Sequence, residues 1–289
     1  MRPIHIFLIL CTVVVWGFNF VATRVVLEIF SPVQMAFARS VLTLAILLPW
    51  WNPFKPIPLK LLAAALSIGA VAFYMLYEAI GMTESLTTVA VGTQLMPPLT
   101  AILALLFFRE RISTRKWLGI LVATVGAVYL AGASTSTLSA TALGLTFLAV
   151  FFYSVGSIII GKSASVGVWR MLAWISVISL IPLCLVALAR GPLYPNLALM
   201  QIQHWLAFLF AVVISGLLGQ ASLFYLYRKY PVSDVAPWIL LTPFFAGLFS
   251  ILIYSESISL SLMLGGAIIL VGVWIQQRGG GRTSAGLVS

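Results

Sequence analysis

The residues best suited to chemistry lie inside long apolar runs rather than between them. Trp16, Asn19 and Phe20 fall at positions i, i+3 and i+4, so they share one face of the helix expected at 4–23. At membrane depth an amide without a hydrogen-bond partner costs on the order of several kcal/mol. Asn19 is therefore expected either to bond a neighbouring helix or to contact a buried substrate.

A second candidate is Arg39, the seventh residue of an apolar run at 33–51. A guanidinium at this depth is costly and usually marks a functional site. The alternative is that its long side chain reaches the headgroup region near Val33, where the run begins. The sequence leaves both interpretations open.

The run at 60–80 carries Tyr74, Tyr77 and Glu78 on one helix face. Glu78 is expected either to pair with Arg39 or Arg24, which would make it structural, or to hold the ammonium group of an amino-acid substrate. Rings beside it supply apolar contact area with a few orienting polar groups. The remaining candidates for substrate contact, in the interiors of other apolar runs, are Gln94, Tyr153, Ser157, Gln220 and Trp238.

Side chains for covalent or metal chemistry are scarce. The chain has 2 histidines, His5 and His204, both near expected helix ends, and 6 acidic residues in all. It contains no G-x-S-x-G, H-E-x-x-H, Walker A or G-x-G-x-x-G motif. No catalytic residue, metal site or cofactor is therefore expected, and the sequence does not predict an enzyme. Cys11 and Cys184 are expected to be free thiols.

The composition predicts a membrane protein. Hydrophobic residues make up 62% of the 289 residues and charged residues only 8%, whereas soluble domains carry roughly a quarter charged residues. The net charge of +10 does not indicate nucleic acid, because the basic residues lie singly or in small groups between apolar runs. The lipid bilayer is the expected partner.

A helix needs about 20 mostly apolar residues to cross a bilayer. Such runs lie at 4–23, 33–51, 60–80, 86–108, 116–132, 141–161, 169–189, 204–226, 232–254 and 259–276. No segment between them is long enough for a soluble domain, and residues 278–289 are expected to form a disordered tail. With the N-terminus placed in the cytoplasm, only Arg24 and Arg190 of the 16 basic residues fall in outside loops. This asymmetry predicts that both termini are cytoplasmic.

The chain also repeats itself. FFRERIS at 107–113 returns as IYSESIS at 253–259, 146 positions later, with its arginines replaced by serines. A unit of five helices is odd, so the second copy must cross the membrane in the opposite sense and lose its cytoplasmic arginines. The expected fold is all-α, with ten transmembrane helices in two inverted five-helix repeats at 1–132 and 141–277. Such repeats are typical of secondary transporters, whose site lies near the midplane where the repeats meet.

Three further features concern helix geometry. Glu110 and Glu256 each precede a serine by three residues and are interpreted as helix-start devices, with a proton relay as the alternative. Pro97 and Pro243, inside expected helices, should kink them. Gly126, among other glycines of the runs at 116–132 and 259–276, should allow close helix approach, within the bundle or at a dimer face.

The residues resemble a known family. WGFNFVATR at 16–24, Arg39, LMPPLTAILALLFFRER at 95–111 and GILVATVGAVYL at 119–130 are similar to the EamA type of the drug/metabolite transporter superfamily. The resemblance covers nearly the whole chain. It implies a multi-pass protein of the bacterial inner membrane that exports amino acids or other metabolites, with the aromatic amino acid exporters as the most similar branch. Glu78 departs from the family pattern, where many relatives carry an uncharged residue.

The expected function is a secondary transporter that exports small metabolites by alternating access, with amino acids, aromatic or other neutral, as the expected class. The runs at 4–23, 60–80, 86–108, 141–161, 204–226 and 232–254 should line its cavity. Alternatives are an importer, a nucleotide-sugar carrier or other metabolite carrier of the same fold, a channel or a membrane enzyme. The substrate, the coupling ion and the choice between monomer and homodimer stay open.

Overall fold

The structure is a computed structural model of the 289-residue chain. It describes residues 1–55, 57–82, 89, 92–93, 95–108, 112–132, 140–161, 166–254 and 260–278. Within these residues the regular structure is helical, and no strand occurs. The predictions for Gln94, Glu110, Glu256 and residues 279–289 lie outside the described residues.

The first half begins with a long helix and continues through shorter ones. Its elements are α1 (Pro3–Leu27), α2 (Pro32–Leu47), η1 (Leu48–Trp50), α3 (Leu59–Leu66), η2 (Ser67–Ala72), α4 (Phe73–Gly81), α6 (Met96–Phe108) and α7 (Thr114–Gly132). α2 starts where Ser31 and Gln34 form a capping box, in which each side chain accepts a hydrogen bond from the other residue's backbone amide. α3, η2 and α4 follow one another without a break.

The second half follows the same plan. Its elements are α8 (Ala140–Gly161), α9 (Val168–Arg190), η3 (Leu197–Leu199), α10 (Ile202–Leu209), η4 (Phe210–Gly219), α11 (Gln220–Lys229), α12 (Val232–Val235), η5 (Ala236–Leu241), α13 (Thr242–Tyr254) and α14 (Leu260–Arg278). Helix therefore occurs in each of the ten apolar runs, and the all-helical fold class is confirmed.

Five helical segments of the described residues are long and apolar enough to cross a membrane. They are Pro3–Leu27, Pro32–Trp50, Leu59–Gly81, Val168–Arg190 and Ile202–Lys229. Shorter apolar helices lie at Gly144–Ile160, Trp238–Phe249 and Leu264–Ile275. Several membrane-spanning helices are thus present, while the number of ten stays a prediction.

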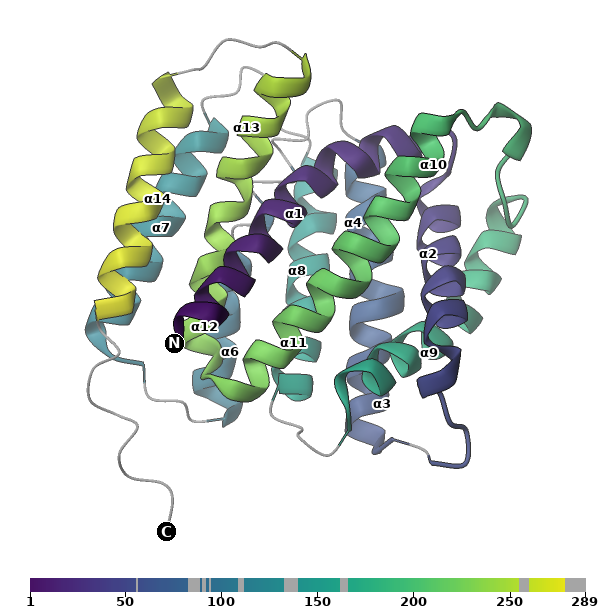
Figure 1. The fold of residues 1–289 in the computed structure, drawn as a ribbon, viewed down its shortest axis with the longest axis horizontal. Helices are drawn as coiled ribbons and strands as arrows, with labels where there is room; N and C mark the ends of the chain where they lie inside the picture. Colours follow the sequence, from purple (N-terminus) through teal and green to yellow (C-terminus); the bar gives the residue numbers. More distant parts are fainter. Residues whose placement is uncertain are drawn as a thin grey trace.

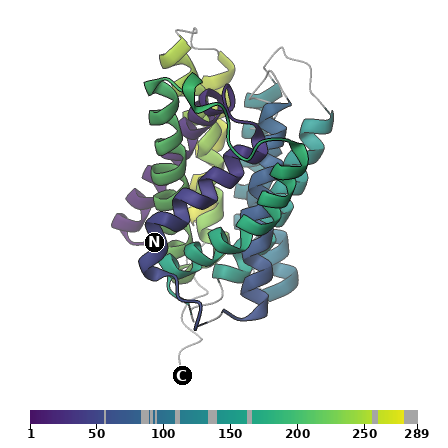
Figure 2. The same ribbon diagram turned by 90° about the vertical axis from the view of Figure 1, so that its right-hand side faces the viewer.

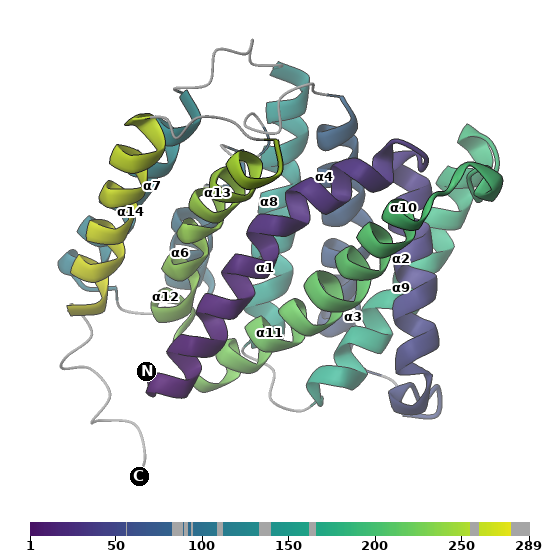
Figure 3. The same cartoon turned by 45° about the horizontal axis from the view of Figure 1, so that its top comes forward.

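The two halves are intertwined rather than side by side. α1 of the first half packs against α10, η4, α11 and α13 of the second half, and Figure 3 shows it lying between α13 and the α10–α11 segment. In return, α8 of the second half packs against α3, η2, α4 and α6 of the first half. A site at the centre of the bundle is therefore built from both halves.

Two helix pairs form the lateral edges of the bundle. α7 packs along α14 at one edge, and α2 packs against α9 at the opposite edge (Figure 1). Figure 2 turns the α2–α9 edge toward the viewer. The start of α1 and the end of α14 lie at the same end of the bundle, as expected for an even number of spans.

In each half, a π-helical segment interrupts an α-helix at equivalent positions. η2 and η4 are both π-helical, and residues 67–72 map onto 213–218 with the offset of 146 positions. π-helical turns are rare and occur frequently at functional sites, because they widen the helix and shift its side chains. Both segments border the cavity described below.

Pro97 and Pro243 lie at the starts of helices rather than inside them. Pro97 is the second residue of α6, and Pro243 is the second residue of α13. The run predicted as one kinked helix at 232–254 instead contains α12, the 3₁₀-helical η5 and α13. A proline in the first helical turn lacks only an amide that has no intrahelical partner, so the helix can start there without loss.

Glycines hold α7 and α14 together by a reciprocal contact. A Cβ added at Gly126 would lie 2.8 Å from the backbone nitrogen of Ile269, and one at Gly272 would lie 2.4 Å from that of Ala123. Gly272 follows Gly126 by 146 positions, and Ile269 follows Ala123 by the same number. This symmetry is the contact expected between two copies of one unit related by a twofold axis. The glycines thus serve packing within the bundle.

Because the neighbour of Gly272 is a backbone atom, Gly272→Ala should force α7 and α14 apart and destabilise the protein by about 1–3 kcal/mol. Gly144→Ala is the matched control, since a Cβ at Gly144 meets nothing within 4 Å. Thermal unfolding of the detergent-purified protein should give a lower midpoint for Gly272→Ala and an equal or higher one for Gly144→Ala. Equal midpoints for both variants would contradict the close packing.

The loops at Phe54 and Tyr194 provide a test of topology. Their side chains are 92% and 69% exposed, and the two loops lie at opposite ends of the bundle. Phe54→Cys and Tyr194→Cys, each in a chain without Cys11 and Cys184, should react with an impermeant maleimide from opposite sides of the membrane. Labelling of both from one side would contradict the spanning arrangement.

Candidate functional site

A cavity lies between the intertwined helices, and the empty space in and around it, open solvent included, is about 850 Å³. On α1 its lining begins at Trp16, beyond the midpoint of the helix, so the cavity lies away from the end that holds the N-terminus. The described residues that line it are Trp16, Asn19, Phe20, Arg39, Ala72, Phe73, Leu76, Tyr77, Thr93, Met96, Ala149, Val150, Tyr153, Ala211, Ser215, Gly216, Gln220, Ile239 and Thr242.

The end of the bundle near the N-terminus is closed by packed apolar side chains. Ile9, Leu103, Ile158 and Leu223 are among the buried residues of this cluster, which joins α1, α6, α8, α11, α12 and η5. Leu223 is 0% exposed. The cavity therefore has a floor on this side.

Most of the residues that the sequence singled out meet in this cavity. Those that line it are Trp16, Asn19, Phe20, Arg39, Tyr77, Tyr153 and Gln220. They come from α1, α2, α4, α8 and α11, which are far apart in the chain. The lining elements match the six predicted runs, and α2 joins them through Arg39.

Besides Glu78, which is described below, three candidates do not border the cavity. Tyr74 lies beside Arg190, whose guanidinium carbon is 5.5 Å from the centre of the ring. Ser157 is 1% exposed on α8, and Trp238 packs among the apolar residues of η5 and its neighbours. Each has a buried polar atom without a hydrogen-bond partner among the described residues, and their contact with a ligand stays a prediction.

Glu78 has a different partner from the one predicted. Its carboxylate accepts a hydrogen bond from Arg190 at the end of α9, whereas the sequence predicted Arg39 or Arg24 as its partner. The pairing became possible because α9 brings its C-terminal end next to α4, a juxtaposition that local sequence does not reveal. Glu78 is therefore engaged outside the cavity.

Trp16 is held by the widened backbone of η4. Its indole nitrogen donates a hydrogen bond to the carbonyl oxygen of Ser215 at 3.2 Å. A Cβ at Gly219 would lie 2.6 Å from that same nitrogen, so the absence of a side chain there makes room for the ring. The contact joins α1 of the first half to the second half and fixes the indole against the cavity wall.

Tyr153 and Gln220 form a second polar contact across the cavity. The Gln220 side-chain amide donates a hydrogen bond to the Tyr153 hydroxyl at 2.8 Å. The pair joins α8 to the start of α11, where the π-helical segment ends. Its hydroxyl and amide groups give the mostly apolar cavity a polar side.

Arg39 contacts an aromatic ring rather than an acid. Its guanidinium carbon lies 3.4 Å from the centre of the Phe73 ring, which is a close cation–π contact. Gly216 leaves space for the group, because a Cβ there would lie 3.1 Å from the Arg39 Nε. The expected alternative, in which Arg39 reaches the headgroups, is wrong, since the side chain borders the cavity.

Sequence reasoning missed several lining residues. Phe73, Ser215, Gly216 and Thr242 border the cavity, although none was singled out. Gly216 has no side chain to draw attention, and Phe73 is one of 18 phenylalanines. Ser215 and Gly216 lie in η4, in the part that corresponds to η2 when the second half is aligned with the first at an offset of 146 positions. The alignment therefore relates these two residues to the other π-helical wall of the cavity.

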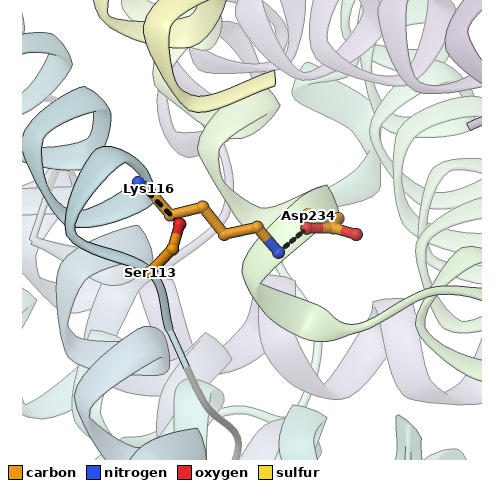
Figure 4. A network of polar contacts seen from close by, with 3 residues as sticks. All are labelled: Ser113, Lys116 and Asp234. Carbon is orange, nitrogen blue, oxygen red and sulfur yellow. Dashed lines mark hydrogen bonds and ion pairs between the residues drawn. The ribbon is translucent and has the colours of Figure 1, made fainter. Parts of the chain in front are cut away.

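Polar contacts link different helices at both ends of the bundle. At the end near the N-terminus, Lys116 of α7 donates a hydrogen bond to Asp234 of α12, and Ser113 accepts one from the Lys116 backbone amide (Figure 4). At the opposite end, His204 of α10 lies 3.3 Å from the Glu28 carboxylate. The Glu78–Arg190 pair belongs to this second group.

The chain was compared with known proteins. The EamA-like transporter family matches residues 3–132 and again residues 140–276, once for each half. The chain belongs to the EamA-like transporter family. The apolar helices and this membership make it a multi-pass membrane protein, and they point to transport rather than catalysis.

Similar proteins share nearly the full length. The chain is 26% identical to a probable amino-acid metabolite efflux pump of Salmonella typhimurium and 27% identical to one of Escherichia coli, covering 94% of both chains in each comparison. It is 25% identical to an uncharacterized transporter of Archaeoglobus fulgidus over 92% of this chain and 96% of that one. A solved crystal structure matches its fold with a TM-score of 0.76 at 15% identity, over 95% of this chain and 96% of that one.

Water access to the cavity can be tested with cysteines. In a chain whose native Cys11 and Cys184 are replaced by alanine, Leu76→Cys lies on the cavity lining and should react with a water-soluble maleimide. Leu223→Cys, at a position that is 0% exposed, is the control and should react at least about tenfold more slowly. Equal rates would contradict an open cavity above a packed floor.

Proposed function

We propose that this EamA-like transporter exports amino acids or closely similar small metabolites by alternating access. The single observation that carries the proposal is the central cavity, which both halves build and which combines aromatic walls with a few polar groups. Binding sites for small molecules commonly have this composition. The names of the relatives from Salmonella typhimurium and Escherichia coli support amino acids as the class.

The polar contacts at the two ends suggest how access would alternate. The Lys116–Asp234 pair joins the first half to the second at the end near the N-terminus. Glu78–Arg190 and Glu28–His204 join the halves at the opposite end. If one group of contacts opens while the other stays closed, the cavity faces one side at a time. In each pair one side chain is buried and the other is more exposed, so a transport cycle that separates them must give the buried group water or a new partner.

The direction of insertion follows from the basic residues. The starts of α3 and α7, which carry Lys60 and Arg115, lie at the end that holds the N-terminus, and Lys55 lies in the loop before α3. Arg24 and Arg190 lie in the last turns of α1 and α9, toward the other end. The positive-inside rule then puts the termini in the cytoplasm. Under this orientation, the packed floor of the cavity faces the cytoplasm. We assign the protein to the bacterial inner membrane, in keeping with the two bacterial relatives.

Counterflow in proteoliposomes tests the function. Vesicles containing the purified protein and an unlabelled amino acid should accumulate the labelled form, and neutral amino acids should compete better than polyamines or nucleotide precursors. Trp16→Ala should lower the rate by roughly tenfold or more, because it removes a large ring from the cavity wall. Tyr153→Phe, which deletes the hydroxyl bonded to Gln220, should have a smaller effect.

The matched control is Ile181→Ala, at a position on α9 that is 70% exposed on the bundle surface. Its counterflow rate should equal that of the unchanged protein. Accumulation of no amino acid, at normal incorporation into vesicles, would overturn the proposed substrate class. Electrical currents above carrier rates would instead indicate a channel.

A further inference from the structure

The charge inside the cavity is unbalanced. Among the lining residues that the structure describes, Arg39 is the one with a formal charge. It also borders a smaller neighbouring cavity of about 370 Å³, whose described lining contains Ser40, Thr43 and Ser176 but no acid. Among the residues that the structure describes, the centre of the bundle therefore carries one formal positive charge.

The acids that the structure describes are all engaged elsewhere. Glu28 pairs with His204, Glu78 with Arg190 and Asp234 with Lys116. Glu84, Glu110 and Glu256 lie outside the described residues. Within the part of the chain that the structure describes, the Arg39 guanidinium thus has no carboxylate partner. Its described contact is the face of the Phe73 ring.

This geometry leaves the hydrogen-bonding edge of Arg39 available. A guanidinium that lies face-on against a ring has its N–H groups directed sideways, in its own plane. A carboxylate approaching in that plane can accept two parallel hydrogen bonds. Between apolar helices such a charged pair is stronger than in bulk water, because the local effective dielectric constant is lower.

The rest of the lining suggests what the carboxylate is attached to. Trp16, Phe20, Tyr77 and Tyr153 present rings, which favour an apolar or aromatic side chain. The Asn19 side-chain oxygen is buried and has no hydrogen-bond partner among the described residues. It would have to turn toward the cavity to accept a hydrogen bond from an N–H group of a ligand.

We propose that Arg39 is the carboxylate-binding residue of the cavity and that it selects molecules carrying a single negative group next to an apolar body. This inference deepens the proposed function, on which it rests. A cationic amine without a carboxylate would add a second positive charge beside Arg39 and should be excluded. A phosphate dianion would bring one more charge than a single guanidinium balances.

Three related compounds separate these requirements in the unchanged protein. 3-Phenylpropionate has the acid alone, L-phenylalanine has acid and amine, and 2-phenylethylamine has the amine alone. Binding is measured as the rise in the thermal unfolding midpoint of the detergent-purified protein. We expect both acids to raise the midpoint and to inhibit counterflow, and 2-phenylethylamine and phenyl phosphate to do neither.

Substitutions then assign the effect to one residue. Arg39→Gln should weaken binding of both acids by roughly tenfold or more, since it removes a charge-assisted pair. Arg39→Lys keeps the charge but lacks the planar guanidinium that forms two parallel hydrogen bonds. Its loss of affinity for both acids should therefore be intermediate. Arg115→Gln is the matched control, because Arg115 is an exposed arginine at the start of α7. It should bind both acids normally.

The outcomes distinguish this inference from the proposed function. Binding of 2-phenylethylamine as tight as that of L-phenylalanine, or unchanged binding of both acids by folded Arg39→Gln, overturns the carboxylate site and leaves transport intact. Binding of 3-phenylpropionate that depends on Arg39, without counterflow of any amino acid, supports the site and overturns the proposed substrate class. Failure of every carboxylate to bind the unchanged protein overturns the inference.

Discussion

The bilayer interior offers no water to an exposed amide or charge, so each such group must find its partner within the bundle. For three groups that line the cavity, the partners lie on other helices. The Trp16 indole bonds the Ser215 carbonyl, the Gln220 amide bonds the Tyr153 hydroxyl, and Arg39 lies against Phe73. Satisfying these groups draws α1, α2, α8 and the η4–α11 segment to one place. The cavity is the space that remains between them.

The duplication explains why that space is central. Because α1 packs among helices of the second half and α8 among helices of the first, neither half encloses a cavity alone. The reciprocal contact of Gly126 and Gly272 shows that equivalent positions meet where α7 and α14 run together. Widened π-helical turns at equivalent places then give both halves the same irregular wall. A symmetric scaffold thus carries a site whose side chains differ between its two halves.

The charged groups divide into two sets with different physical roles. Glu78, Glu28 and Asp234 are paired near the ends of the bundle, and in each pair one side chain is buried and the other is more exposed. Each of these acids thus has a hydrogen-bonded partner. Arg39 lies deeper and has an aromatic face in place of an acid. Electrostatic stabilisation of Arg39 is therefore incomplete in the structure, whereas the end pairs are complete.

Much of the site can be recognised from the amino-acid sequence. A polar or amphipathic side chain inside an apolar run has few possible hydrogen-bond partners in a membrane. This is why the sequence singles out Trp16, Asn19, Arg39 and Gln220. The repeated segments at 107–113 and 253–259 also indicate a duplicated chain. Their charge pattern and the lengths of the apolar runs around them can be read from neighbouring residues alone. The family match to each half agrees with that duplication.

The sequence by itself determined the apolar helices, the repeat and the set of polar residues that must be buried. The tertiary structure alone decided which of them meet. Glu78 pairs with a residue 112 positions away, and Phe73 and Gly216 frame Arg39 although neither contrasts with its neighbours in the chain. The reason is that helical periodicity depends on residues a few positions apart, whereas a cavity depends on the side chains that distant helices bring together.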